Sequence, residues 1–334
     1  MNKIKINKPE VLAPVGSKEA FYSAIAAGCD ALYLGGKSFG ARAYANNFTY
    51  EELEELINYA HLFNVKIYYT LNNIVKDIEM KELKTSLKEL SQLPIDAYIL
   101  QDLGVYSYIK EHFSDLVVHA STQMNLHSIE DARMIKSLGF DRVVLSRECS
   151  LKDISRIKDA VDIEIEAFVH GALCYCYSGQ CLMSSVYGGR SGNRGKCAQP
   201  CRMPYTIDDE KAYFLSPKDQ MTLDIMPDLI KAGIDSFKIE GRMKGPEYVY
   251  LATKLYKKYR DLSYSLIIEG RESEYKVEAE DVKKLNQLFN RGNFIDGYYK
   301  RHNGREMVSY THGKNLGLKI GRLRKTKGIE MVLN

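Results

Sequence analysis

Five of the seven cysteines in this chain lie within residues 174–201. Four of them, Cys174, Cys181, Cys197 and Cys201, are separated by six, fifteen and three residues. Four thiolates at such spacing can enclose a tetrahedral zinc ion or bind an iron–sulfur cluster. The gaps are wider than those usual in structural zinc sites, which favours iron–sulfur and keeps zinc and unmetallated thiols as alternatives. We therefore predict these four as metal ligands, with Cys176 as an alternative ligand.

A catalytic cysteine is a competing interpretation, because His170 precedes Cys174 by four residues. A nucleophilic thiol needs a base within hydrogen-bond reach and a third group that orients the base. One histidine near several cysteines does not meet that requirement, so metal binding is favoured. The glycine-rich segment 188–196 carries Arg190 and Arg194 and either forms a solvated loop or binds an anion such as phosphate.

The elements that position these residues alternate between short apolar strands and amphipathic helices, which is typical of parallel α/β folds. Eight strands favour a (β/α)₈ TIM-barrel-like fold, with an open doubly wound sheet as the alternative. We expect the barrel over residues 1–262, a Cys-rich insertion at 171–204 between strands seven and eight, and an extension over 263–334. We expect that extension to contain a helix at 278–290 and the start of a β-rich domain that is cut short. The predicted strands are 10–12, 31–34, 65–71, 97–100, 116–119, 142–145, 163–169 and 236–239.

Polar side chains follow most of these strands, where barrel enzymes carry their active sites. We assign Arg147 and Arg242 as anchors for a carboxylate or phosphate, and His170, Glu148 and Glu240 as acid–base or orienting groups. A buried ion-pair network that closes the barrel is the alternative for these side chains. The further predicted substrate-binding residues are Asp102, Gln123, Arg190 and Arg194.

Composition sets broad limits on location and partners. The formal net charge of +4 neither requires nor excludes nucleic acid. Charges interrupt every apolar run, so no membrane span is predicted. The first residues contain no apolar stretch typical of a signal peptide, so a cytoplasmic location is expected. The oligomeric state is not indicated by any pattern.

Several motifs together resemble the peptidase U32 family over roughly residues 10–320. They include the segments at 10–17, 31–36, 119–125 and 145–148, and those at 170–174, 177–181 and 238–244. The glycine-rich segment at 188–195 and the segment at 289–292 are most similar to the branch of 23S rRNA cytidine hydroxylases.

The resemblance implies one of two activities. Some members of the family are described as collagenase-like peptidases, and others as oxygen-independent hydroxylases of tRNA wobble uridine, of a 23S rRNA cytidine or of ubiquinone precursors. It also implies a cluster, expected as 4Fe–4S, on cysteines of this region, and prephenate as the hydroxyl source of the RNA branches. Some members use a thiol near the position of Asp235 or Ser236; this chain has none there, so Cys201 is the candidate fourth ligand.

Hydrolysis of a peptide requires an activated nucleophile or a metal-bound water beside oxyanion donors. The chain contains no H-E-x-x-H motif and no correctly spaced G-x-S-x-G motif. We therefore predict an iron–sulfur-dependent RNA hydroxylase that forms 5-hydroxycytidine in 23S rRNA. Hydroxylation of tRNA wobble uridine and collagenase-like proteolysis remain the alternatives.

Overall fold

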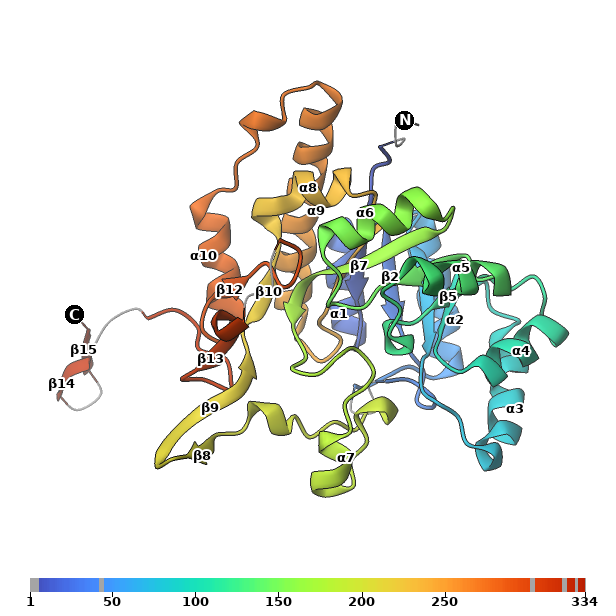
Figure 1. Cartoon of the computed structure of the whole chain (residues 1–334), viewed down its shortest axis with the longest axis horizontal. Helices are drawn as coiled ribbons and strands as arrows, with labels where there is room; N and C mark the ends of the chain where they lie inside the picture. The colour runs from blue at the N-terminus through green and yellow to red at the C-terminus, as the bar shows by residue number, and fades with distance from the viewer. Residues whose placement is uncertain (1–5, 42–44, 301–303, 320–322, 328–329, 334) are drawn as a thin grey trace.

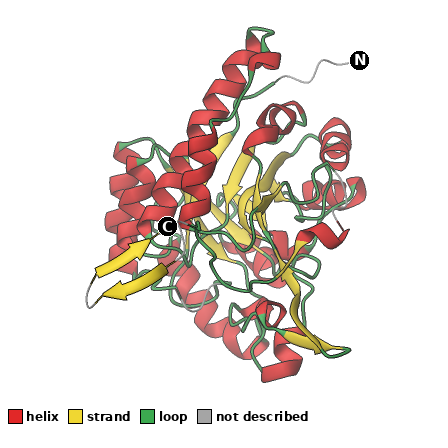
Figure 2. Ribbon diagram, turned by 90° about the vertical axis from the view of Figure 1, so that its left-hand side faces the viewer, coloured by secondary structure: helices red, strands yellow, loops and turns green. Residues whose placement is uncertain are grey.

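Eight parallel strands close into a barrel in the computed structural model, which describes residues 6–41, 45–300, 304–319, 323–327 and 330–333. The eighth strand, β11, pairs with both β1 and β7, so the sheet has no open edge there. The strands form an inner layer surrounded by helices (Figures 1 and 2). The predicted TIM-barrel-like fold is confirmed, and the open-sheet alternative is wrong because β11 joins the two ends. The barrel strands are β1 (Glu10–Pro14), β2 (Ala31–Leu34), β3 (Lys66–Leu71), β4 (Ala97–Leu100), β5 (Val118–Ala120), β6 (Arg142–Val144), β7 (Glu164–Ala172) and β11 (Ser236–Ile239).

The helices begin where the sequence supplies side-chain caps. Thr49 and Glu52 exchange side-chain-to-backbone hydrogen bonds at the start of α2 (Tyr50–Leu62). Ser128 begins α5 (Ile129–Leu138) and Ser150 begins α6 (Leu151–Ala160) in the same way, each with an aspartate as the reciprocal partner. Such caps satisfy backbone N–H groups that have no partner within the helix. The other helices around the barrel are α1 (Lys18–Ala26), α3 (Met80–Leu90), α4 (Leu103–His112), α8 (Met226–Lys231) and α9 (Pro246–Ile268).

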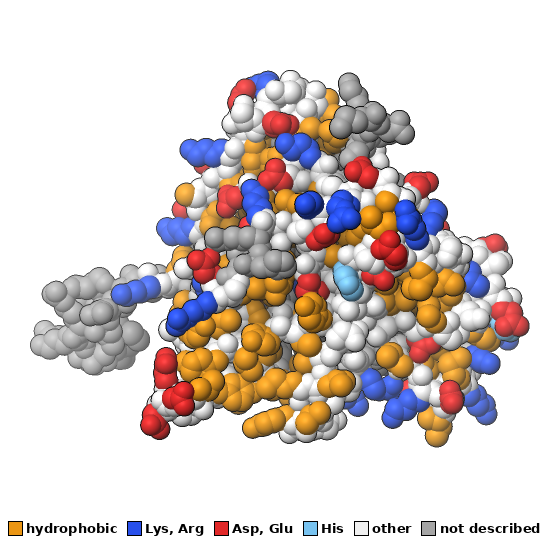
Figure 3. Space-filling view, viewed as in Figure 1, with side chains coloured by type: hydrophobic (Ala, Val, Ile, Leu, Met, Phe, Trp, Pro, Cys, Tyr) orange, Lys and Arg blue, Asp and Glu red, His pale blue; other side chains and the backbone are white. Residues whose placement is uncertain are grey.

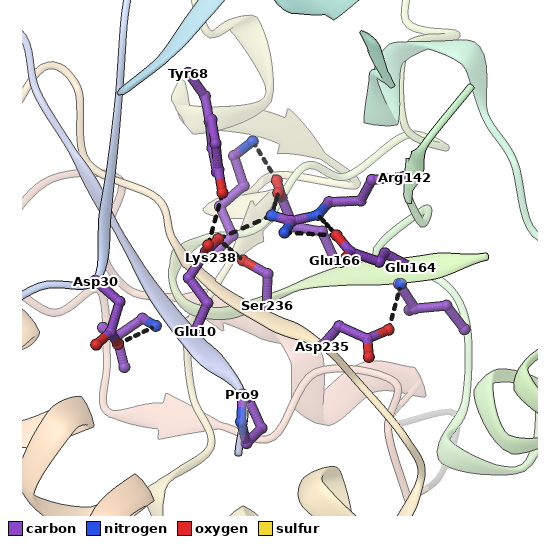
Figure 4. A network of polar contacts seen from close by, with 12 residues as sticks. Pro9, Glu10, Asp30, Tyr68, Arg142, Glu164, Glu166, Asp235, Ser236 and Lys238 are labelled. Atoms are coloured by element: carbon purple, nitrogen blue, oxygen red, sulfur yellow. Dashed lines mark hydrogen bonds and ion pairs between the residues drawn. The ribbon is translucent and has the colours of Figure 1, made fainter. Parts of the chain in front are cut away.

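In addition to a small apolar cluster that includes Ala31 and Ala97, the barrel interior holds a network of charged side chains (Figure 4). The Arg142 guanidinium donates to Glu10 at 2.8 Å and to Glu166 at 3.2 Å. Lys238 donates to the second oxygen of Glu166 at 2.7 Å, and the Tyr68 hydroxyl donates to Glu10 at 2.6 Å. Because buried charges are tolerated when they are paired, this network ties β1, β3, β6, β7 and β11 together.

The part of the chain between β7 and α8 forms a separate layer at one end of the barrel (Figure 1). It contains α7 (Met183–Gly188), the antiparallel pair β8 (Tyr205–Ile207) and β9 (Glu210–Pro217), and β10 (Asp219–Met221). β10 runs antiparallel to the end of β7, pairing Gln220 with Gly171. The chain therefore turns back along β7 before it enters β11.

The residues that follow the barrel pack onto this inserted layer. α9 continues to Ile268 instead of ending near Leu262, because Ser263 and Leu266 are still buried. α10 (Ala279–Leu288) matches the helix expected at 278–290. β12 (Phe294–Ile295) pairs with β10, and β13 (Val308–Tyr310) pairs with β9. The strand pattern expected near the end forms a hairpin of β14 (Leu323–Lys327) and β15 (Glu330–Leu333), while Arg322 lies outside the described residues.

None of the helices in the described part of the chain combines the length and apolar character needed to cross a bilayer.

The charged interior predicts a specific stability difference. Glu166→Gln should lower the free energy of unfolding by about 3–5 kcal/mol, because Lys238 and Arg142 then lose a buried carboxylate partner. Glu164→Gln is the matched control, since Glu164 also pairs with Arg142 but is 55% exposed and should change stability by less than about 1 kcal/mol. Urea denaturation of both variants tests this; equal losses would contradict it.

Candidate active site

The cysteines that follow β7 lie in one group. Burial raises the pKa of Cys174, and the neighbouring thiols of Cys181 and Cys197 act in the same direction. Burial likewise raises the pKa of Cys201 to about 11, with contributions from Cys174, Cys197 and Cys181. Cys174 and Cys201 therefore each lie near the other three thiols. Cys176 belongs to the same group, because Cys181 and Cys174 both raise its pKa after burial.

Short backbone contacts hold the loops that carry these thiols. The backbone N–H of Gln199 donates to the Cys197 sulfur at 3.3 Å, and the N–H of Ala198 donates to Ser184 on α7 at 2.9 Å. A Cβ atom on Gly192 would lie 3.7 Å from the Cβ of Cys197 and 3.9 Å from the carbonyl oxygen of Cys181. Loop 188–196 thus passes directly between two of the cysteines. Within the described residues, no three Cys, His, Asp or Glu side chains converge closely enough to hold one metal ion.

Charged residues from the neighbouring strand ends lie beside the thiols. Arg147, which follows β6, donates to Glu240, which follows β11, at 2.9 Å. Its guanidinium also stacks over Phe168 at 3.8 Å and lowers the otherwise raised pKa of Cys174. Three predicted groups are therefore brought together: a cation, a carboxylate and the first cysteine.

Ser178 fastens the cysteine segment to the end of β6. Its backbone N–H and its hydroxyl contact Glu148 Oε1 at 3.1 and 3.3 Å, and its hydroxyl oxygen accepts from the backbone N–H of Arg147 at 3.2 Å. The other oxygen of Glu148, Oε2, is buried and has no hydrogen-bond partner among the described residues, and the same is true of Nε of Arg147. Buried polar atoms without partners are energetically costly, so these two atoms are candidates for binding a ligand.

A second set of charges adjoins the first. Arg291 pairs with Asp219 on β10 at 2.6 Å, and Arg202 donates to the carbonyl oxygen of Leu173 at 2.7 Å. Burial and the nearby Arg291 lower the pKa of Arg202 to about 10. Burial and the same arginine lower the pKa of Lys244 to about 7, while Asp219 and Glu240 oppose this shift.

These residues come from three separate parts of the chain. Lys244 and Arg291 lie in the motifs that carry the family resemblance, at 238–244 and 289–292, which is the signal that could have identified them. Asp219 lies in no such motif, and it joins the group because β10 turns back along β7.

His170 lies in an aromatic environment. Its side chain is 1% exposed, and its ring centre is 5.6, 5.3 and 5.5 Å from those of Tyr248, Tyr256 and Phe294. A β-bulge shifts the pairing of β11 with β7, so that Lys238 faces Phe168 and Ile239 faces His170. Burial, with a smaller effect from Lys244, lowers the pKa of His170 to about 3, so the imidazole is neutral at physiological pH.

Several predicted binding residues hold the backbone in place. Arg242 donates to Asn47 at 2.7 Å and to Thr70 at 3.1 Å. Asp102 caps α4 and also accepts from the backbone N–H of Val75 at 3.0 Å.

The remaining three predicted residues lie along the cysteine segment or its loop. The backbone of Gln123 lies directly against Gly179, since a Cβ there would come within 2.2 Å of its carbonyl oxygen. Arg194 donates to the carbonyl oxygen of Ile74 at 2.8 Å and pairs with Glu79, whereas Arg190 is exposed and donates to the carbonyl oxygen of Lys196 at 3.0 Å.

Lys244 gives a testable pH dependence. Acylation requires the unprotonated amine, so labelling of Lys244 by acetic anhydride should rise with a midpoint near pH 7, the value set by burial and Arg291. An ordinary exposed lysine labels with a midpoint near about 10.4. Arg291→Gln is the control, because removing that cation should raise the midpoint. Peptide mass spectrometry measures the labelling, and a wild-type midpoint above pH 9 would contradict the assignment.

Comparison with known proteins places the chain in a family. A sequence profile described as peptidase family U32 matches residues 16–309. The chain is 36% identical to the 23S rRNA 5-hydroxycytidine synthase of Escherichia coli, over 96% of this chain and 50% of that protein. It is 35% identical to tRNA hydroxylation protein P1 of Bacillus subtilis, over 86% of this chain and 70% of that protein.

A third relative carries a different name. The chain is 34% identical to a protein named collagenase from Porphyromonas gingivalis, over 98% of this chain and 81% of that protein. The chain spans half the length of the Escherichia coli relative. The profile match and these identities agree with the family predicted from the motifs, and the chain belongs to peptidase family U32.

Proposed function

We propose that this chain is the catalytic part of an iron–sulfur-dependent, oxygen-independent RNA hydroxylase that forms 5-hydroxycytidine in 23S rRNA. The observation that carries the proposal is the segment with Cys174, Cys181, Cys197 and Cys201, which leaves the carboxyl end of β7 beside the Arg147–Glu240 ion pair. The relatives named for rRNA and tRNA hydroxylation supply the reaction class. Barrel enzymes carry their chemistry at this end of the strands.

Four thiols are a suitable donor set for an iron–sulfur cluster. Cys174, Cys181, Cys197 and Cys201 would hold it, and the Gln199 amide that donates to the Cys197 sulfur is the kind of hydrogen bond that tunes such a group. When bound, the cluster would supply electron transfer. Arg202, directly after Cys201, contributes positive charge next to the thiolates.

The other side chains of the site bind and orient. Arg147, Lys244 and Arg291 offer positive charge to a carboxylate or a phosphate, which suits both RNA and prephenate, the hydroxyl donor that we propose. Glu148 Oε2 accepts a hydrogen bond from the bound base or co-substrate. Glu240 holds the Arg147 guanidinium in position.

Peptide hydrolysis is the second candidate, because one relative is named collagenase. His170 is the histidine nearest in sequence to the cysteine group, and its aromatic surroundings and low pKa make it a poor base at neutral pH. This observation favours hydroxylation over thiol-dependent proteolysis.

The substrate is tested in cells. In a strain that lacks the gene, 23S rRNA should lose one hydroxyl group, a mass decrease of about 16 Da, at a cytidine. Mass spectrometry of nuclease digests of rRNA and tRNA measures this, and expression of the gene should restore the hydroxyl. Loss confined to tRNA uridine would move the substrate to the alternative branch, and unchanged RNA would contradict hydroxylation.

The cluster is tested by serine substitution. Anaerobically purified protein should contain iron and sulfide and absorb visible light, and Cys174→Ser, Cys181→Ser, Cys197→Ser or Cys201→Ser should each remove most of both. Cys176→Ser is the matched control, because Cys176 lies in the same thiol group but is not a proposed ligand. If Cys176→Ser loses iron and Cys201→Ser retains it, the fourth ligand is Cys176 and not Cys201. Stoichiometric zinc without iron would overturn the cluster.

A further inference from the structure

Five tyrosines lie around the thiol group. Tyr175 and Tyr177 alternate with the cysteines at 174 and 176. Tyr187 lies on α7, which packs against the short turn Pro200–Arg202, and Tyr205 donates to the carbonyl oxygen of Pro200 at 2.9 Å in that turn. Burial and Glu148 raise the pKa of Tyr298. Tyr177, Tyr175 and Cys174 act in the same direction, so Tyr298 lies near them. The tyrosines therefore come from several segments near the cysteines.

The rings of three of these tyrosines face solvent. Tyr187 is 77% exposed and Tyr177 is 67% exposed, and Tyr175 is exposed as well. Leu182 and Val186, next to them on and before α7, are also exposed. Apolar side chains gather along this lower edge of the molecule, over α7 and β9 (Figure 3). Clustered exposed apolar side chains mark interaction sites on soluble proteins.

The charges next to the tyrosines are positive on the side of the cysteine loop. Arg190 follows α7 by two residues, and Lys196 precedes Cys197; both are exposed. Arg190 donates to the carbonyl oxygen of Lys196, so the two cations lie close together. The acidic residues Asp208, Asp209 and Glu210 lie apart from them in the β8–β9 turn and limit the positive region on that side.

We propose that Tyr175, Tyr177 and Tyr187 form a stacking surface for unpaired bases of single-stranded RNA, with Arg190 and Lys196 binding its phosphates. The inference rests on the proposed function and names the surface that presents the strand to the thiol group. Exposed aromatic rings beside cations are the usual means of binding single-stranded nucleic acid, because every base can stack. Tyr175, Tyr177, Tyr187, Arg190 and Lys196 together are called the tyrosine surface below.

RNA fits this surface better than a second protein does. The rings are bordered by the two exposed cations Arg190 and Lys196, which complement phosphate groups, and lysine is depleted at protein–protein interfaces. Double-stranded RNA is recognised through its backbone and shape, and its stacked bases are not accessible to the rings. The tyrosine surface therefore selects a single-stranded or looped segment.

Fluorescence anisotropy tests this with a fluorescein-labelled single-stranded oligoribonucleotide of mixed sequence and with its duplex. Tyr187→Ala should weaken binding of the single strand by roughly 5- to 100-fold, and Tyr187→Phe should keep it, because stacking needs the ring and not the hydroxyl. Tyr22→Ala is the matched control, since Tyr22 is a partly exposed tyrosine on α1. Lys196→Ala should reduce the slope of log affinity against log salt by about 0.7.

Equal affinity of Tyr187→Ala and wild type for the single strand would overturn the inference. So would tighter binding of the duplex, or self-association of the chain in light scattering that Tyr187→Ala abolishes without changing RNA affinity. The result is independent of the hydroxylation test. If binding depends on Tyr187 but cellular RNA is unchanged in the deletion strain, the proposed reaction is wrong and the tyrosine surface stands. If the RNA loses its hydroxyl but binding does not depend on Tyr187, the proposed reaction stands and the tyrosine surface is wrong.

Discussion

The barrel depends on one buried carboxylate. Glu166 on β7 accepts from Arg142 on β6 at 3.2 Å and from Lys238 on β11 at 2.7 Å, so it binds the strands on both sides of its own. Removing three charges from water is unfavourable unless each keeps a well-placed partner, and these partners meet only when the strands hold one register. Because β11 is the strand that closes the barrel, the same carboxylate connects closure with register. The order of residues at the far end of the strands follows from that register.

At the carboxyl ends, β7 lies between β6 and β11, and the ion pair of Arg147 with Glu240 joins the segments that follow those two strands. The chain that leaves β7 must pass beside this pair, which explains why Cys174 lies near Arg147. Ser178 then fixes the segment to Glu148. The antiparallel β10 adds Asp219 to the same region. Arg291 reaches it because β12, which lies shortly after Arg291 in the sequence, pairs with β10. The site is thus assembled from strand ends and from one insertion that turns back on β7.

Much of the barrel could be predicted because its signals are local. Apolar runs located the eight strands to within a few residues, and Thr49, Ser128 and Ser150 marked three helix starts through contacts with residues three positions later. The clustering of the cysteines is visible in the sequence itself, since five of the seven lie within residues 174–201. The contacts of His170 could not be predicted, because they depend on a bulge in the pairing of β11 with β7. The group of Lys244, Asp219 and Arg291 depends on β10 and β12, whose three and two residues are too few to show a pattern.

The charges of this second group have a consequence for binding. Arg147 and Arg291 each have a carboxylate partner, whereas Arg202 donates to uncharged oxygens of Leu173 and Ser216. Burial and Arg291 lower the pKa of Lys244 to about 7, so both disfavour the charged ammonium form of this side chain in the folded protein. An anion bound among these cations, whether thiolate, carboxylate or phosphate, opposes the effect of Arg291 and raises the pKa of Lys244. Binding of the anion and uptake of a proton by Lys244 are therefore coupled above pH 7, and each strengthens the other.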